Sequence, residues 1–229
     1  MLLRSVSAVV VALAVAACGG HVMQSRPYTP AMDSALASTP PAARSYAELR
    51  AEPLSDVPLK INVDERSQVF QFPTGKSYTV FLELPPHRSD RLIAVRSWCD
   101  CAGFQMAGTI FVPIAVILDT QLEEKATLSF VTQPPKQTTI LASPASYYAT
   151  HALAPEYRYV VIYTDPAWFG QTAPDIREVR AIPGGALVTT RSYGTLEQTQ
   201  VTLFPGGAAV DIPVKGSAVG SIEVELLGP

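Results

Sequence analysis

Cys18 is the residue whose chemistry the sequence specifies most clearly. It follows two alanines and precedes Gly19, and upstream lie Arg4 and an apolar stretch over residues 6–15. Two small residues before a cysteine are the cleavage pattern of bacterial lipoprotein signal peptidase, and the basic and apolar segments complete a signal peptide. The apolar stretch is shorter than the roughly 20 residues of a permanent membrane-spanning helix. We therefore expect residues 1–17 to be removed and acyl chains to be attached to the Cys18 thiol.

Acylation of Cys18 predicts where the chain resides. Each buried methylene of an acyl chain contributes about 0.8 kcal/mol, so several chains anchor a protein durably to a bilayer. Gly19 stands where an aspartate would typically retain a lipoprotein in the inner membrane. The pattern indicates a lipid-anchored protein at the periplasmic face of the outer membrane. Plain secretion after cleavage at Ala17 is the alternative.

Cys99 and Cys101 are the other two thiols of the chain. Once Cys18 is acylated an even number of cysteines remains, and an oxidising compartment favours their pairing. A Cys99–Cys101 disulfide needs a tight turn, which Asp100 and Gly103 permit. We expect a structural disulfide, with redox catalysis and metal binding as weaker alternatives because neither a thioredoxin-like context nor further Cys or His ligands lie nearby.

Aromatic residues in two segments form a candidate ligand or partner surface. Tyr147, Tyr148 and His151 are three or four residues apart and would share one helix face, and Trp168 and Phe169 lie in a predicted turn. Aromatic rings of this kind stack on sugars or pack on partner proteins. The alternative is that they plug the open end of the fold.

Other chemistry finds little support in the sequence. Thr74-Gly75-Lys76-Ser77 resembles the end of a phosphate-binding loop, but Phe70 stands where the first glycine of that loop is required. There is no Gly-x-Ser-x-Gly motif, which leaves His151 as the one base for an acyl-transfer enzyme. Acidic pairs that could serve a glycosidase are Asp64-Glu65, Glu123-Glu124 and Glu223/Glu225, and solvated turns or strand faces explain them better. We expect no catalytic residue, no metal and no cofactor.

The charge balance bears on partners. The formal net charge is −3, and removal of Arg4 with the signal peptide makes it about −4. A weakly acidic chain without a basic cluster lacks the electrostatic footprint of a nucleic-acid-binding protein. We expect no nucleic acid as a partner.

The elements that must position these residues are mainly strands. In 76–84, Tyr78, Val80, Leu82 and Leu84 fall on one face and Ser77, Thr79 and Glu83 on the other, which predicts a half-buried strand. Pro73-Thr74-Gly75 joins it to a partner strand over 68–72. The segment 109–118 is almost wholly apolar, which predicts a strand covered on both faces with a bulge or an edge at Pro113. Further predicted strands are 91–97, 126–132, 157–163, 186–190, 200–204, 208–214 and 221–227.

Helix is expected in short insertions. Ser143-Pro144 is a typical helix start and predicts a helix to Leu153, and 164–170 predicts one helical turn. Residues 18–58 contain many Pro, Ala and Ser, which predicts a flexible, disordered tether with at most a short helix over 42–49. We therefore expect a signal peptide over 1–17, a lipidated tether over 18–58, an antiparallel β-sandwich of the jelly-roll or immunoglobulin-like class over 59–174, and a C-terminal β segment over 175–229 that continues the sandwich or forms a small second unit.

Two strands resemble a known family. The segments 110–119 and 159–164, followed by the 174–175 and 184–188 regions, are similar to the maltose operon periplasmic protein family over roughly residues 61–188. Members are periplasmic, are linked genetically to maltose and maltodextrin use, and have no settled molecular activity. The resemblance implies a location and a physiological setting, and carries over no catalytic residue.

Together these features predict a non-catalytic outer-membrane lipoprotein that acts as an accessory or binding protein in maltodextrin use. Its expected partners are the membrane, through the lipid anchor, and a maltodextrin or another envelope protein. The alternatives are a glycan-acting enzyme or a structural subunit of an envelope assembly.

Overall fold

The computed structural model is an all-β sandwich of two sheets, confirming the predicted fold class. It describes residues 30–40, 43–86, 91–100, 108–133, 136–137, 142–143, 145–174, 178–182, 185–193, 196–204 and 208–228. The predicted signal peptide, Cys18 and Cys101 lie outside these residues. In the described part of the chain no helix is long and apolar enough to cross a membrane.

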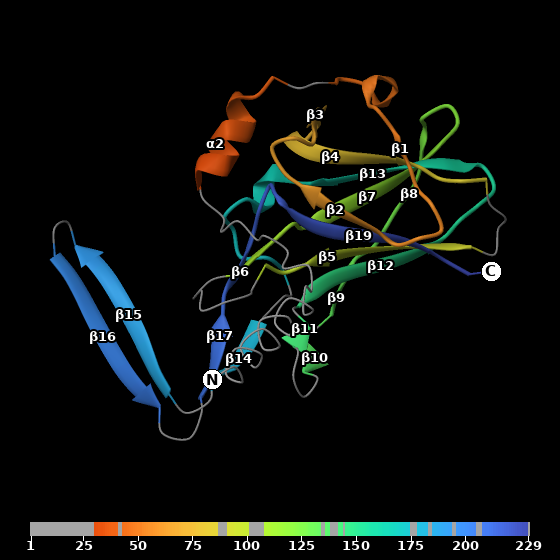
Figure 1. The fold of residues 1–229 in the computed structure, drawn as a ribbon. Helices are drawn as coiled ribbons and strands as arrows, with labels where there is room; N and C mark the ends of the chain where they lie inside the picture. Colours follow the sequence, from red (N-terminus) through yellow and green to blue (C-terminus); the bar gives the residue numbers. More distant parts are fainter. Residues whose placement is uncertain are drawn as a thin grey trace, which may run out of the picture.

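The first sheet has six strands, in the order β1-β4-β13-β7-β8 with β3 paired to β4 (Figure 1). All its pairs are antiparallel except that of β1 with β4. Its strands are β1 (Glu52–Pro53), β3 (Gln68–Phe72), β4 (Gly75–Glu83), β7 (Pro113–Asp119), β8 (Glu124–Thr127) and β13 (Tyr157–Thr164).

The second sheet has five strands, in the order β2-β19-β5-β12-β9, and all its pairs are antiparallel. Its strands are β2 (Leu59–Val63), β5 (Leu92–Trp98), β9 (Val131–Gln133), β12 (Ser146–Ala152) and β19 (Gly220–Leu227). In Figure 1 it lies below the six-stranded sheet, and the inward-facing residues of both sheets form one hydrophobic core.

The alternating pattern of the sequence explains how the sheets face one another. In β19, Ile222, Val224 and Leu226 are buried in the core between the sheets, whereas Glu223 and Glu225 are partly exposed on the other face. This arrangement confirms the expectation that the two glutamates lie on the outward face of a strand.

The predicted hairpin of 68–72 with 76–84 is confirmed as β3 and β4, whose turn ends at Gly75 with φ 135°. The prediction that β4 is half-buried is wrong, because residues 77–82 are all buried. Phe81 on the outer face packs in a second cluster with Leu49 and Phe70. The outer face of this sheet is therefore covered as well as the inner one.

Residues 109–118 do not form a single strand. β6 (Gly108–Ile110) pairs with β18 (Val214–Gly216), and the chain then passes Phe111 and Val112 before β7 begins at Pro113 in the six-stranded sheet. The predicted burial on both faces of β7 is confirmed. Proline at the first position of the strand is consistent with its missing N–H.

The predicted helix over 145–153 is wrong, because residues 146–152 form the strand β12 between β5 and β9. Tyr147 and Ala149 are buried on one face, and Tyr148 and Thr150 lie on the other. Tertiary packing has overridden the helix-start signal of Ser143-Pro144. The predicted turn at 164–170 is confirmed as the 3-10 helix η2 (Pro166–Trp168), which the Asp165 side chain caps at the Ala167 N–H, 2.9 Å away.

The predicted tether does not extend to residue 58. A helix, α2 (Pro30–Ser38), buries Leu36 in the main core, and Leu54 joins the same core. The 3-10 helix η1 (Tyr46–Glu48) is flanked by Ala43 and Leu49, which are buried on the outer face of the six-stranded sheet. The described residues between 30 and 58 are therefore part of the folded body.

After residue 175 the chain forms two strand pairs before it returns to the sandwich. β14 (Glu178–Ile182) pairs with β17 (Ala208–Ile212), and the hairpin of β15 (Gly185–Tyr193) with β16 (Leu196–Phe204) lies between them in the sequence. β18 and β19 then return to the sandwich. A further short pair joins β10 (Lys136–Gln137) to β11 (Ala142–Ser143).

Candidate functional site

The five aromatic and histidine residues singled out in the sequence do not form one surface. Tyr147 is buried beside Cys99, and its hydroxyl donates to the backbone oxygen of Pro174. Trp168 packs against the same small cluster, and Phe169 packs against the main core. These three residues fill the fold, as the alternative interpretation expected.

Tyr148 and His151 lie elsewhere. Tyr148 is half-buried on the outer face of the five-stranded sheet, where its ring faces the Arg96 guanidinium at 4.8 Å. His151 lies on the opposite face of β12, and its ring centroid is 6.1 Å from that of Tyr157. The shared helix face that motivated the grouping is absent because the segment is a strand.

Cys99 is buried and is disulfide-bonded. The cysteine bonded to Cys99 lies outside the described residues, so the pairing with Cys101 stays a prediction. The backbone around it is held by a pair of hydrogen bonds between Asp100 and Thr109, with N–O distances of 2.7 and 3.1 Å.

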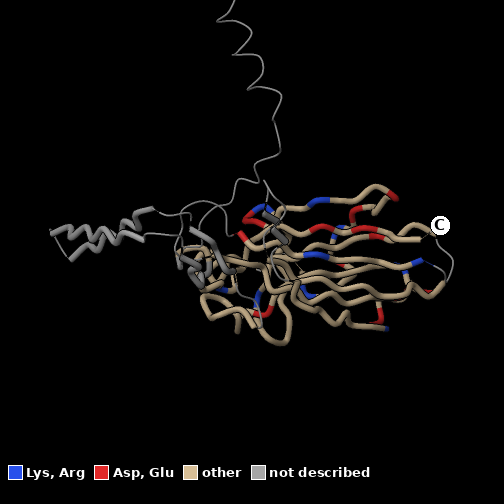
Figure 2. Tube along the Cα trace, turned by 90° about the horizontal axis from the view of Figure 1, so that it is seen from below, with Lys and Arg blue, Asp and Glu red and all other residues tan. Residues whose placement is uncertain are grey.

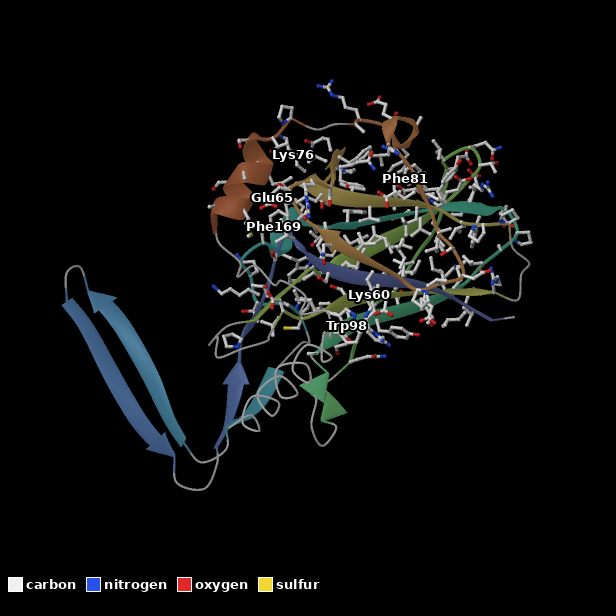
Figure 3. The ribbon with its side chains drawn as sticks, in the orientation of Figure 1. Lys60, Glu65, Lys76, Phe81, Trp98 and Phe169 are labelled. Carbon is white, nitrogen blue, oxygen red and sulfur yellow. The ribbon has the colours of Figure 1, made fainter. Side chains whose placement is uncertain are left out.

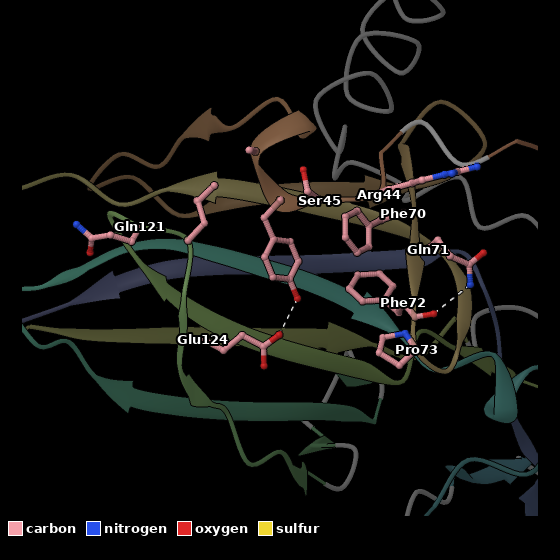
Figure 4. A pocket seen from close by; sticks show the side chains of 11 residues that line it. Arg44, Ser45, Phe70, Gln71, Phe72, Pro73, Gln121 and Glu124 are labelled. Atoms are coloured by element: carbon pink, nitrogen blue, oxygen red, sulfur yellow. Dashed lines mark hydrogen bonds between the residues drawn. The ribbon is translucent and has the colours of Figure 1, made fainter.

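A depression of about 740 Å³ opens on the outer face of the six-stranded sheet (Figure 4). It is built from three segments that are far apart in the sequence: η1, the end of β3 with its turn, and the β7–β8 turn. We call it the Tyr46 depression, and it is lined by Arg44, Ser45, Tyr46, Ala47, Phe70, Gln71, Phe72, Pro73, Gln121, Leu122 and Glu124. Figure 4 shows Phe70 and Phe72 at one end and Gln121 at the other.

Stacked rings make the wall of the depression. The Tyr46 and Phe70 rings are 5.2 Å apart and nearly parallel, and the Phe70 and Phe72 rings are 4.7 Å apart. Phe72 in turn stacks on Tyr163 of β13, with centroids 3.6 Å apart. The period-two spacing of Phe70 and Phe72 places both rings on the outer face of β3.

The Tyr46 ring packs on Phe70, and a hydrogen bond to Glu124 holds its hydroxyl in place. Its hydroxyl donates to Glu124 Oε1 at 2.9 Å, across 78 positions of sequence. Burial of the ring raises the pKa of the Tyr46 hydroxyl above its ordinary value, and the hydrogen bond to Glu124 and the charge of that carboxylate raise it further. No cation within the described residues pairs with Glu124, so its charge faces the depression without a counter-ion.

The β7–β8 turn holds Leu122 at the depression in a strained backbone conformation, with φ 64°. The Asp119 carboxylate organises the turn by accepting from the N–H groups of Gln121 and Glu123, at 2.8 and 3.0 Å. The Lys125 ammonium lies 2.9 Å from Asp119 Oδ2 and, more than any other contact, lowers the pKa of this carboxyl. Strain of this kind persists only where its surroundings over-determine it.

The arrangement can recognise a ligand without covalent chemistry. The lining combines aromatic and aliphatic groups with a carboxylate, two amides and a guanidinium. Among the described residues no group of three or more His, Cys, Asp or Glu side chains could hold a metal ion.

Sequence reasoning missed this depression. The sequence indicates Glu124 only as half of a solvated acidic pair and predicts that Tyr46 lies in the tether. One available signal was that Phe70 and Phe72 are on the face of β3 opposite Val69, which indicates burial on both faces. The contact of Tyr46 with Glu124 has no local signal in the sequence.

Comparison of the chain with protein-family models, with curated proteins and with solved structures found no match.

Proposed function

We propose that this chain is a non-catalytic binding protein of the bacterial cell envelope, anchored by acyl chains on Cys18 at the periplasmic face of the outer membrane. The small-small-Cys-Gly sequence supports the anchor. A fold does not specify a function by itself, so the binding role rests on a site that the β-sandwich carries.

The proposed ligand is a glycan related to maltodextrins, bound in the Tyr46 depression. The observation that carries this proposal is an open depression lined by both packed aromatic rings and hydrogen-bonding groups. The apolar C–H faces of a sugar pack on aromatic groups, and its hydroxyls suit the carboxylate of Glu124 and the amides of Gln71 and Gln121. About 740 Å³ lies within the range of small-molecule sites. The resemblance to the maltose operon family agrees with this ligand class.

Titration calorimetry of the full chain with maltose and longer maltodextrins tests the ligand. We expect saturable heat, and we expect Glu124→Gln to weaken binding about 10-fold or more, since a hydrogen bond to a charged group contributes about 1.5–3 kcal/mol. Glu225→Gln, which removes one carboxylate from the outer face of the opposite sheet, is the matched control and should leave the affinity unchanged. Absence of heat with every maltodextrin would refute the ligand, and shortening of the oligosaccharides would support the enzyme alternative instead.

The anchor is tested separately by fractionating cells. Cys18→Ala, or treatment with globomycin, should move the protein from the membrane to the soluble fraction. Continued membrane attachment of the Cys18→Ala variant would contradict the proposed anchoring whatever the calorimetry shows.

A further inference from the structure

The outer face of the five-stranded sheet carries a row of side chains that no role above uses. Strand register places Lys60, Glu223, Arg96, Tyr148 and Val131 side by side, one from each strand. Figure 3 shows Lys60 and Trp98 at this sheet, away from Phe81 of the other sheet. We call this the Arg96 row.

Arg96 lies between two aromatic rings and forms no ion pair with the described residues. Its guanidinium lies 4.9 Å from the ring centroid of Trp98 and 4.8 Å from that of Tyr148. Glu223 is directly opposite in register, yet it accepts a hydrogen bond from Trp98 Nε1 at 3.3 Å and forms no ion pair with Arg96. The Nε atom of Arg96 is buried without a hydrogen-bond partner among the described residues. The row therefore offers a preorganised cation beside a carboxylate.

The face also has the composition of a protein contact. Val131 and Leu92 are 59% and 39% exposed, and both lie on it. Trp, Tyr and Arg are the residue types that contribute most at interfaces. Lys and Arg are interspersed with Asp and Glu along the described chain rather than gathered by sign (Figure 2). A surface with both signs close together suits a partner with the same mixed pattern.

We propose that a second copy of this chain packs on this face about a two-fold axis. In a two-fold contact the same surface is used twice, so each residue must suit the one it meets. An axis parallel to the strands and between β19 and β5 places Arg96 against Glu223 of the second copy, and Glu223 against its Arg96. The same axis places Lys60 over the Tyr148 ring of the second copy, a favourable cation–π arrangement.

The strand register disfavours a two-fold axis one half-strand away. An axis along the centre of β5 would bring the two Arg96 side chains together, and like charges in an interface cost several kcal/mol. Strands about 4.8 Å apart make the two arrangements differ by a shift of about 2.4 Å for the axis. Charge pairing therefore selects the axis between β19 and β5.

The size of the face predicts a weak dimer. The four strands that face one another about this axis, β2, β19, β5 and β12, are about 4.8 Å apart and about seven residues long, which gives a contact on the order of 450 Å². Two copies would then bury on the order of 900 Å², below the roughly 1,200 Å² at which standard-size specific interfaces begin. We therefore expect a weak, transient dimer.

Charge exchange tests the proposal by sedimentation of the full chain in mild detergent. Arg96→Glu alone and Glu223→Arg alone should each weaken self-association about 100-fold, because each places like charges together. An equimolar mixture of the two variants should associate, since every contact of the mixed dimer then joins opposite charges. Glu52→Arg, the same charge change at an exposed position of β1, is the control and should leave the association unchanged.

Each remaining outcome decides the proposal. A wild-type chain that stays monomeric to about 1 mM, single variants that still dimerise, or a mixture that stays monomeric would overturn it. If Glu223→Arg lowers the melting temperature, Glu223→Gln replaces it in the test, because the amide oxygen still accepts the hydrogen bond of Trp98. Glu223→Gln should weaken the dimer about 10-fold. Loss of maltodextrin binding in these variants is not expected, because the Tyr46 depression is on the other sheet.

Discussion

At the scale of single residues, the Thr164 hydroxyl is a buried polar group whose surroundings predict the effect of removing it. Thr164 is fully buried, and its Oγ1 has no hydrogen-bond partner among the described residues. Replacing a buried, unsatisfied hydroxyl with an apolar group of the same shape removes a desolvation penalty. We expect Thr164→Val to raise the free energy of unfolding by up to about 1 kcal/mol in urea denaturation.

The neighbouring hydroxyl is the matched control. Ser77 is equally buried, and its Oγ accepts the N–H of Thr164 at 3.1 Å. Ser77→Ala should therefore lower the free energy of unfolding by about 1–2 kcal/mol, because that N–H is left without a partner. Equal effects of the two substitutions would contradict the assigned hydrogen bond.

Asp119 gives a second prediction for a single residue. Its lowered pKa means that its contribution is present at neutral pH and is lost as the pH falls below about 3.9, the value in the unfolded chain, and through the lower folded value. Asp119→Asn should lower the urea midpoint at about pH 7, and the difference from wild type should shrink towards about pH 2. Equal midpoints at neutral pH would show that the turn does not need the carboxylate.

Tyr46 makes the stability of the fold depend on pH in the opposite direction, at alkaline pH. Its raised pKa lets the folded chain keep a phenolic proton that the unfolded chain loses near pH 10, so stability should fall as the pH rises above about 10. The pKa values of Tyr78 and Tyr163 are raised too, chiefly by burial. Tyr46→Phe should therefore make the decline between about pH 10 and 12 shallower without abolishing it, as measured by urea denaturation. An unchanged decline would refute the role of Tyr46.

At the scale of elements, two adjacent tyrosines distinguish the strand β12 from the helix that its sequence suggested. Tyr147 is buried and Tyr148 is half-buried on the opposite face. Tyr147→Ala should cost about 3–4 kcal/mol of unfolding free energy, as large aromatic truncations in cores do. Tyr148→Ala should cost about 1 kcal/mol, since its ring packs mainly on Arg96. Similar costs for both would contradict the strand.

The sequence allowed the type of most strands to be predicted, because alternation and β-branched runs are local properties. It did not reveal where an apolar run divides into strands of two different sheets. Residues 109–118 are continuous in composition, yet Ile110 and Pro113 belong to strands of different sheets. That division depends on which partners are available, which is a property of the whole fold. The same holds for β12, whose neighbours β5 and β9 decided its conformation.

At the scale of the whole molecule, the sandwich could be predicted but its N-terminal limit could not. Residues 43–58 have the Pro, Ala and Ser content of a linker, and only scattered apolar residues. Three of these, Ala43, Leu49 and Leu54, are buried on the sheets. The Tyr46 depression was missed for the same reason, because one of its walls comes from a segment without a periodic pattern.

Truncation tests how far the folded body extends. Removal of residues up to 58 takes away Leu36, Leu49 and Leu54, and uncovers Phe70 and Phe81. Each buried leucine contributes about 1.5–3 kcal/mol, so the loss is on the order of 5 kcal/mol, close to the whole stability of a domain. A chain that begins at residue 59 should therefore melt far below one that begins at residue 30 and should bind more of a hydrophobic dye. The two chains are compared by circular-dichroism melting and dye fluorescence. Equal melting temperatures would show that residues 30–58 do not stabilise the sandwich and act as a tether.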